Sequence, residues 1–226
     1  MKHAHVIVIA AVVLGLAALS TPRALAEDKD GLPDLTAQWW QNVLSIPTTV
    51  NPLLDPAGDY CMVGQRGSVW FLYGSWDGQP KYRTCSAPAD RQLFFPVVNY
   101  VNINTPGVCG QVDNYTARQL RAMIKPIIDG ATNLSVTIDG RRVKDLDRIE
   151  SIVFEVTYGA DNIFVAPCAG DSPPGTYSPA VDDGYYVLLK GLEPGTHTLH
   201  IHGELPSINA VQDITYYLNI VPVSLK

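Results

Sequence analysis

Two segments of the chain repeat their apolar residues at the spacing of a helix. The first spans Asp34 to Ser45, where Asp34 or Thr36 can cap the N-terminus and the apolar residues share one broad face. The second lies within residues 114–130, and Pro126 is expected to kink it or to end its regular part. The pattern therefore predicts an N-terminal helix and one amphipathic helix inserted midway.

The remaining pattern is typical of strands, because apolar residues either alternate with polar ones or form short runs. The predicted strands are Ser68–Gly74, Lys81–Cys85, Gln92–Val101, Leu134–Ile138, Ser151–Tyr158, Asn162–Val165, Tyr185–Leu189, Thr196–His202 and Asp213–Val221. The Asp77-Gly78 turn is expected to join the first two as a hairpin. Short strands with frequent turns predict a mostly β fold, an antiparallel β-sandwich of the Ig-like or jelly-roll-like kind. No clean linker divides residues 27–226, so we expect one domain.

The first 26 residues have the form of a cleaved export signal. Lys2 precedes the uncharged apolar run Val6–Ala18, and Ala24–Ala26 offers the small-x-small pattern that a signal peptidase needs. The apolar run is shorter than the roughly 20 residues that span a bilayer. The sequence therefore predicts a secreted or periplasmic protein without a stable membrane anchor.

Charge argues against polyanionic partners. The chain has 16 Lys and Arg residues against 22 Asp and Glu residues, a net charge of −6. Cleavage after residue 26 removes two basic residues and brings the net charge to −8. An acidic chain without a basic run does not attract phosphate backbones or anionic lipid surfaces. We therefore expect no nucleic-acid partner.

All four cysteines lie after the export signal, and an oxidising compartment favours two disulfides. The three possible pairings remain open, and we favour Cys61 with Cys85 and Cys109 with Cys168, because the first closes a compact loop around a predicted strand. The wide spacing resembles no zinc ribbon, and no Cys-x-x-Cys motif supports redox catalysis.

Several short motifs resemble a group of exported bacterial proteins of unknown function. The motifs are Trp39-Trp40, Ser45–Pro47, Cys61 with Gly64-Gln65, Val69–Leu72, Leu93–Asn99, Pro194–Thr198 and Asp213–Tyr216. The resemblance covers most of residues 27–226 and implies a shared secreted architecture. It implies no activity and no site residue.

The three histidines after residue 26 lie within six residues, from His197 to His202. Alternate residues on a strand share a face, so His200 and His202 point the same way. Such a pair can supply two imidazole ligands to one transition metal, such as Zn or Cu. A hairpin register that sets Asp213 opposite His202 would add Asp213 as a third ligand or as an orienting partner. The alternative is an ordinary, half-exposed sheet face.

Aromatic residues are the other candidates for a binding site. Trp76 in the turn near Gly78, together with Tyr185 and Tyr217, could stack on a sugar ring or hold an apolar small molecule. The alternative for these side chains is core packing. Asp182 and Asp183 are expected in a solvated acidic turn rather than as the carboxylate pair of a glycosidase.

Three functions remain open on the sequence. The first is an exported binding module that holds an unknown small molecule or glycan on an aromatic and histidine-bearing sheet face. The second is a metal-dependent enzyme or metal carrier centred on His200 and His202. The third is a structural protein of the cell envelope. No Gly-x-Ser-x-Gly motif is present, and the sequence identifies no catalytic residue.

Overall fold

The computed structural model describes residues 31–223, so the predicted export signal of residues 1–26 lies outside the described residues. Two α-helices are present, α1 (Leu32–Ser45) and α2 (Ala117–Asp129), with two single-turn 3₁₀ helices, η2 (Thr48–Val50) and η3 (Pro206–Ile208). Both helices occur where the apolar spacing predicts them. No helix in residues 31–223 is long and apolar enough to cross a bilayer.

The two helices begin in different ways. Thr116 caps α2 through a capping box, in which its hydroxyl accepts from the backbone of Gln119 and the Gln119 side chain binds the Thr116 backbone. At α1 the predicted side-chain cap is wrong, because the helix begins two residues before Asp34, with Gly31 as its N-cap. Pro33 occupies the first turn of α1, where a missing N–H leaves no hydrogen bond unmade.

The strands form two five-stranded sheets. The first sheet has the order β1-β3-β8-β6, and β7 also pairs with β8. Its members are β1 (Val69–Phe71), β3 (Gln92–Ile103), β8 (Gly175–Leu189), β6 (Asp147–Glu150) and β7 (Phe154–Tyr158). The second sheet has the order β2-β10-β9-β4-β5. Its members are β2 (Lys81–Pro88), β10 (Ala210–Val221), β9 (Gly195–Leu205), β4 (Thr132–Ile138) and β5 (Arg141–Arg142).

The mostly β prediction is confirmed, but not every pairing is antiparallel. β1 runs parallel to β3, and β2 runs parallel to β10. The expected hairpin between β1 and β2 is therefore wrong, because the two strands belong to different sheets. The segment Asn162–Val165 is a turn rather than a strand, and β6 is a strand that the sequence pattern did not reveal.

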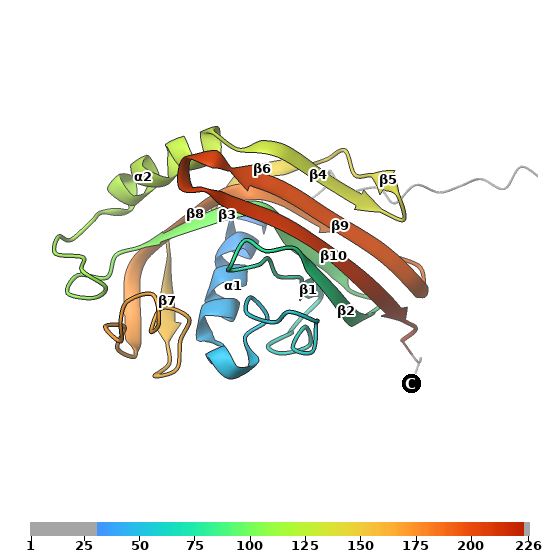
Figure 1. Cartoon of the computed structure of the whole chain (residues 1–226), viewed down its shortest axis with the longest axis horizontal. Coiled ribbons are helices and arrows are strands. Elements are labelled where there is room, and N and C mark those ends of the chain that lie inside the picture. The colour runs from blue at the N-terminus through green and yellow to red at the C-terminus, as the bar shows by residue number, and fades with distance from the viewer. Residues whose placement is uncertain (1–30, 224–226) are drawn as a thin grey trace, which may run out of the picture.

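The elements stack in three layers, with α1 on one face of the first sheet and the second sheet on its other face (Figure 1). β3 is buried on both sides, which explains its continuous apolar run. Leu93, Phe95 and Val97 pack between the two sheets, whereas Phe94 packs under α1. A third apolar cluster joins α2 to Val98 of β3.

Pro96 interrupts β3 without breaking its pairing to β8. The Phe94 carbonyl accepts from the Leu72 N–H on the β1 side of the strand, and backbone direction alternates along a strand. Pro96 therefore faces the same side as Phe94, beyond the end of β1, where no ladder hydrogen bond is lost. The register to β8 shifts between Pro96 and Val98, as it does at a β-bulge.

The disulfides join Cys61 to Cys85 and Cys109 to Cys168, the pairing that the sequence favours. The first ties the loop before β1 to β2 in the core between the sheets. The second ties the loop after β3 to the loop between β7 and β8. Each disulfide therefore fixes a loop, the first to a strand and the second to another loop.

Candidate functional site

His200 and His202 lie on the outer face of the second sheet, in the register expected from the sequence. Asp213 of β10 pairs with His202 of β9, and Thr215 pairs with His200. His200 Nε2 lies 2.8 Å from Asp213 Oδ1, whereas His202 Nε2 lies 3.4 Å from Glu204 Oε1. Asp213 therefore contacts His200, one of the two histidines predicted to bind the same metal ion.

His200 and His202 lie apart and do not share a carboxylate partner. The rings of His200 and His202 are 6.5 Å apart, and each is paired with a different carboxylate. Within residues 31–223, no three His, Cys, Asp or Glu side chains converge so that they could hold a metal ion. His197 is also paired, with Asp139, and this contact raises its pKa against the opposing effect of burial.

The three aromatic residues predicted to bind a ligand do not come together. Tyr217 is 44% exposed on the outer face of the second sheet, where it pairs with Thr198. Tyr185 lies on β8 and packs against two of the core clusters. Trp76 is 40% exposed in the loop after β1, on a different part of the molecule. Of these three residues, only Trp76 lines the pocket described next, which we call the main pocket.

The main pocket is a hollow of about 260 Å³ that combines aromatic walls with a few polar groups. Trp39 and Trp40 of α1 line it together with Trp76 and Phe164, and the last two rings meet edge to face at 5.7 Å. Its polar lining comes from the side chains of Ser75, Asn99 and Gln212. The remaining lining is contributed by Leu53, Gly74, Val98, Tyr100, Val101, Leu205, Ile208, Ala210 and Val211.

The main pocket forms where the edge strand of each sheet ends before the strand it pairs with. β1 pairs with β3 only as far as Phe94, so the lining residues Val98–Val101 follow the end of that pairing. β2 pairs with β10 only from Ile214 onward, so the lining residues Ala210–Gln212 precede that pairing. The pocket therefore lies between two strand edges that have no strand neighbour among residues 31–223.

The loop that carries Trp76 is fixed by hydrogen bonds from three directions. Trp39 Nε1 donates to the Leu72 carbonyl over 3.0 Å. Gln212 accepts from the Ser75 N–H and donates to the Ser75 carbonyl, as a neighbouring strand would. Gly74 makes this contact possible, because a Cβ atom there would lie 2.7 Å from the Gln212 amide nitrogen.

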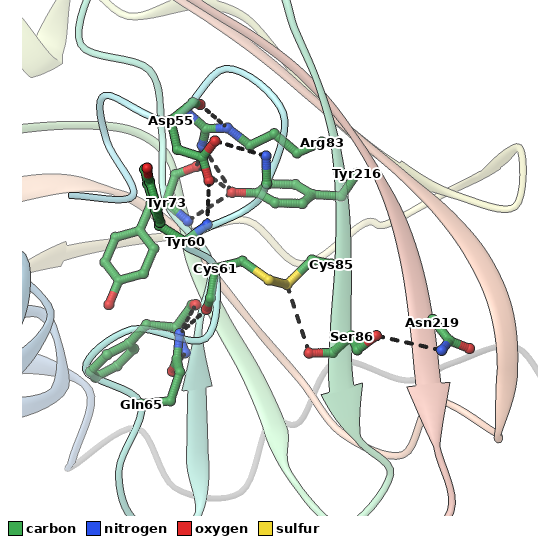
Figure 2. Close-up of a disulfide and its surroundings, with 12 residues drawn as sticks. Asp55, Tyr60, Cys61, Gln65, Tyr73, Arg83, Cys85, Ser86, Tyr216 and Asn219 are labelled. Carbon is green, nitrogen blue, oxygen red and sulfur yellow. Dashed lines mark hydrogen bonds between the residues drawn. A yellow bond between two sulfur atoms is a disulfide. The ribbon is translucent and has the colours of Figure 1, made fainter. Parts of the chain in front are cut away.

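The third direction is the buried side chain of Arg83, which Figure 2 shows beside Asp55, Tyr73 and Tyr216. Its guanidinium donates to the carbonyls of Asp55, Tyr73 and Gly74 and to the Tyr216 hydroxyl. Its second terminal nitrogen, Nη2, is buried without a partner among the described residues. Arg83 therefore holds the start of the Trp76 loop against β2 and β10, while the nearby disulfide joins the loop before β1 to β2.

A fully buried carboxyl group lies directly behind the pocket wall. Asp182 accepts from Trp40 Nε1 over 2.7 Å and from the Tyr186 hydroxyl over 2.8 Å. Asn99 Nδ2 in turn donates to the Tyr186 hydroxyl over 2.9 Å. Trp40 lines the pocket, so its side chain alone separates Asp182 from the pocket interior. Asn99 also lines the pocket and is connected to Asp182 through Tyr186. The expected solvated acidic turn is wrong at this position, since Asp182 is 0% exposed within β8.

Burial determines the protonation of this carboxyl group. Loss of hydration raises the pKa of Asp182 to about 8, and the charge of neighbouring Asp183 adds to the rise. The hydrogen bonds from Tyr186 and Trp40 favour the carboxylate and oppose that rise. Asp183 instead forms a two-pronged ion pair with Arg148. Asp182 is therefore neutral at pH 7 and able to change charge in mildly alkaline solution.

Sequence reasoning missed Asn99, Phe164, Asp182 and Gln212 as parts of this site. Phe164 lies in a predicted strand, Gln212 lies one residue before the predicted strand Asp213–Val221, and Asn99 lies in an apolar run, so their residue types carry no ligand signal. The one available signal was the adjacent tryptophans of α1, both of which are buried and both of which line the pocket. Comparisons with models of protein families, with curated proteins and with solved structures find no match for this chain.

Proposed function

We propose that the protein is a binding module that holds a small, mainly apolar ligand in the main pocket. The observation that carries this proposal is the pocket itself, an aromatic hollow with three polar side chains and an exposed tryptophan at its rim. Ligand sites generally combine apolar walls with a few placed polar groups. We place the ligand in the main pocket and not on the aromatic and histidine-bearing sheet face that the sequence suggested. Of the ligand-binding residues predicted from the sequence, Trp76 alone lines the main pocket.

The pocket sets the size and chemistry of the ligand. Its volume of about 260 Å³ exceeds that of a cavity of roughly 150 Å³ that holds benzene. The pocket therefore has room for an apolar group larger than one benzene ring. Asn99 and Gln212 offer amide groups, and a neutral Asp182 behind Trp40 avoids placing a negative charge beside an apolar ligand.

Fluorescence titration with N-phenylnaphthylamine, a neutral apolar probe, tests the proposal. Its emission is expected to rise on binding, and Trp76→Ala is expected to weaken binding about tenfold, because aromatic anchors dominate the energy of such sites. Tyr217→Ala is the matched control, since Tyr217 has a similar exposure but lies on the outer sheet face. No probe binding, or a loss in Tyr217→Ala alone, would contradict the proposal.

The other functions lack a supporting arrangement of residues. A metal-dependent enzyme or carrier would need a third ligand beside His200 and His202, and the paired carboxylates do not provide one. A structural envelope protein would need no pocket.

We further propose that the protein is exported, as two disulfides favour. We also propose that its two sheets form a β-sandwich. An Ig-like or jelly-roll-like topology stays a prediction.

A further inference from the structure

A second hollow of about 160 Å³ continues the main pocket along β3. The two hollows share Val101 and Phe164, and the second extends to Ile103 and Tyr158. Together they form one groove, which we call the edge groove, along Val98–Ile103. Six residues of strand span roughly 20 Å. The edge groove is thus long and narrow, which suits an extended chain better than a compact molecule.

The edge groove follows a strand edge that is ready for pairing. The Asn104 N–H donates to the Pro179 carbonyl, on the β8 side of the strand. Because backbone direction alternates, the N–H and C=O groups of Asn99, Val101 and Ile103 face the opposite edge. No strand of residues 31–223 pairs with that edge.

The pocket wraps around this edge rather than resting on one face of the sheet. Val98 packs on the α2 side of β3, whereas Val101 packs on the α1 side, and both line the main pocket. A chain lying in the groove could therefore pair with β3 through its backbone while its alternate side chains enter the two hollows. This combination of a free edge and side-chain pockets is how sheet proteins bind extended peptides.

The charge around the edge groove indicates the sign of the charge that a bound peptide would carry. The loops of residues 104–116 and 159–174, which border the second hollow, contain Asp113, Asp161 and Asp171 and no Lys or Arg. Two of these aspartates are engaged within the protein, Asp161 with Thr48 and Asp171 with the Cys109 backbone. Their charges still make the rim negative, and a cationic partner is attracted to such a rim.

We propose that the edge groove binds an extended peptide that pairs with β3 as an added strand, with apolar side chains in the hollows and basic side chains at the rim. The inference rests on the proposed function, since the main pocket is one half of the groove. It identifies the apolar group held in the main pocket as a side chain of a polypeptide segment.

The test uses a library of short synthetic peptides in which lysine alternates with varied apolar residues. Binding is measured by the change in tryptophan emission and by competition with N-phenylnaphthylamine. Members of the library are expected to bind and to displace the probe. For the best binder, N-methylation of alternate amides on one edge should weaken binding at least about tenfold, whereas N-methylation on the other edge should not, because only one edge faces β3.

A matched pair of protein variants tests the same contact from the other side. Val101→Pro removes an N–H from the free edge but none from the ladder to β8, as Pro96 does in the native strand. It is expected to weaken peptide binding about tenfold relative to Val101→Ala, which shortens the same side chain but keeps the N–H. Circular dichroism and thermal unfolding establish that both variants are folded. A substitution of Asn99 by proline provides a second variant if Val101→Pro does not fold.

Each outcome separates the inference from the proposed function. Probe binding without binding of any library peptide would overturn the inference and leave the pocket as a small-molecule site. Equal weakening by both patterns of N-methylation would also overturn it, because side chains alone would then account for binding. Displacement of the probe by a fatty acid but not by peptides would assign the groove to acyl chains. Absence of probe binding would contradict the proposed function itself.

Discussion

Replacing the buried carboxyl group of Asp182 by an amide tests the electrostatics behind the pocket wall. In the unfolded chain this group loses its proton near the ordinary aspartate value of about 3.9. In the folded protein burial raises its pKa to about 8. Between these two values the folded state holds a proton that the unfolded state has released. The free energy of unfolding must therefore fall as pH rises through this window.

The magnitude follows from the width of the window. Each pH unit within it costs about 1.4 kcal/mol, so the group removes on the order of 4 kcal/mol between about pH 4.5 and pH 7.5. Such a change is a large part of the 5–15 kcal/mol, roughly, that stabilises a typical domain. Asp182→Asn keeps the shape of the side chain and cannot ionise. The variant should therefore lack this contribution to the pH dependence.

Urea unfolding of the wild type and of Asp182→Asn at both pH values measures the difference. The stability of the variant relative to the wild type is expected to increase by about 4 kcal/mol from the lower to the higher pH. Asp59→Asn, a change of an exposed carboxyl group, serves as the control and should follow the wild type. Parallel pH profiles for the wild type and Asp182→Asn would contradict a raised pKa of Asp182, because the buried group would then titrate as it does in the unfolded chain.

Three further predictions concern other parts of the molecule. Reduction of the disulfides should lower the melting temperature markedly, since loss of one native disulfide costs about 2–5 kcal/mol; an unchanged melting curve would contradict a structural role. Gly184→Ala should destabilise the protein by about 1–3 kcal/mol in urea unfolding, because its Cβ would lie 2.6 Å from Asn99 Cβ and 2.7 Å from the Val98 carbonyl oxygen. Gly159→Ala, whose Cβ meets nothing closer than 3.7 Å, is the control and should cost much less. Added Zn²⁺ should leave the melting temperature unchanged, because His200 and His202 are paired with separate carboxylates; a rise that a His200→Ala/His202→Ala variant abolishes would restore the metal hypothesis.

Local patterns were sufficient for the elements that depend on near neighbours. The alternation in His197–His202 and in Asp213–Val221 predicted two strands, and their register with Asp213 opposite His202 is confirmed. The helix around Leu120 was also predictable, because its apolar residues share one face and Thr116 caps it. In each case the determining interactions lie within a short stretch of sequence or between neighbouring strands.

Contacts between distant segments could not be predicted in this way. β2 pairs in parallel with β10, whose first partner residue, Ile214, lies 133 positions beyond Lys81. Asp182 is buried by contacts with α1, and its partner Trp40 is separated from it by 142 positions. The sequence around Asp182 is acidic and contains Gly184, which locally favours a solvated turn. Tertiary packing overrides that preference and creates the polar group behind the pocket.

The main pocket exists because the edge strands of the two sheets, β1 and β2, do not extend along the whole of β3 and β10. β1 and β2 are both shorter than the strands they accompany, so the edges of β3 and β10 continue alone beside the main pocket. The bound loop of Gly74–Trp76 and the disulfide-linked turn that carries Phe164 close the hollow from the sides. The proposed ligand site therefore lies at an open sheet edge, away from the histidine-bearing face.

Mapping of backbone amide chemical shifts by NMR during titration with N-phenylnaphthylamine locates the ligand on the protein. The largest shifts are expected at Gly74–Trp76, Val98–Val101 and Ala210–Gln212, the segments that line the main pocket. No significant shifts are expected at Thr198 and His200, on the outer face of the second sheet. Shifts concentrated on that outer face, with none around Trp76, would rule out binding in the main pocket and place the ligand on the histidine-bearing surface.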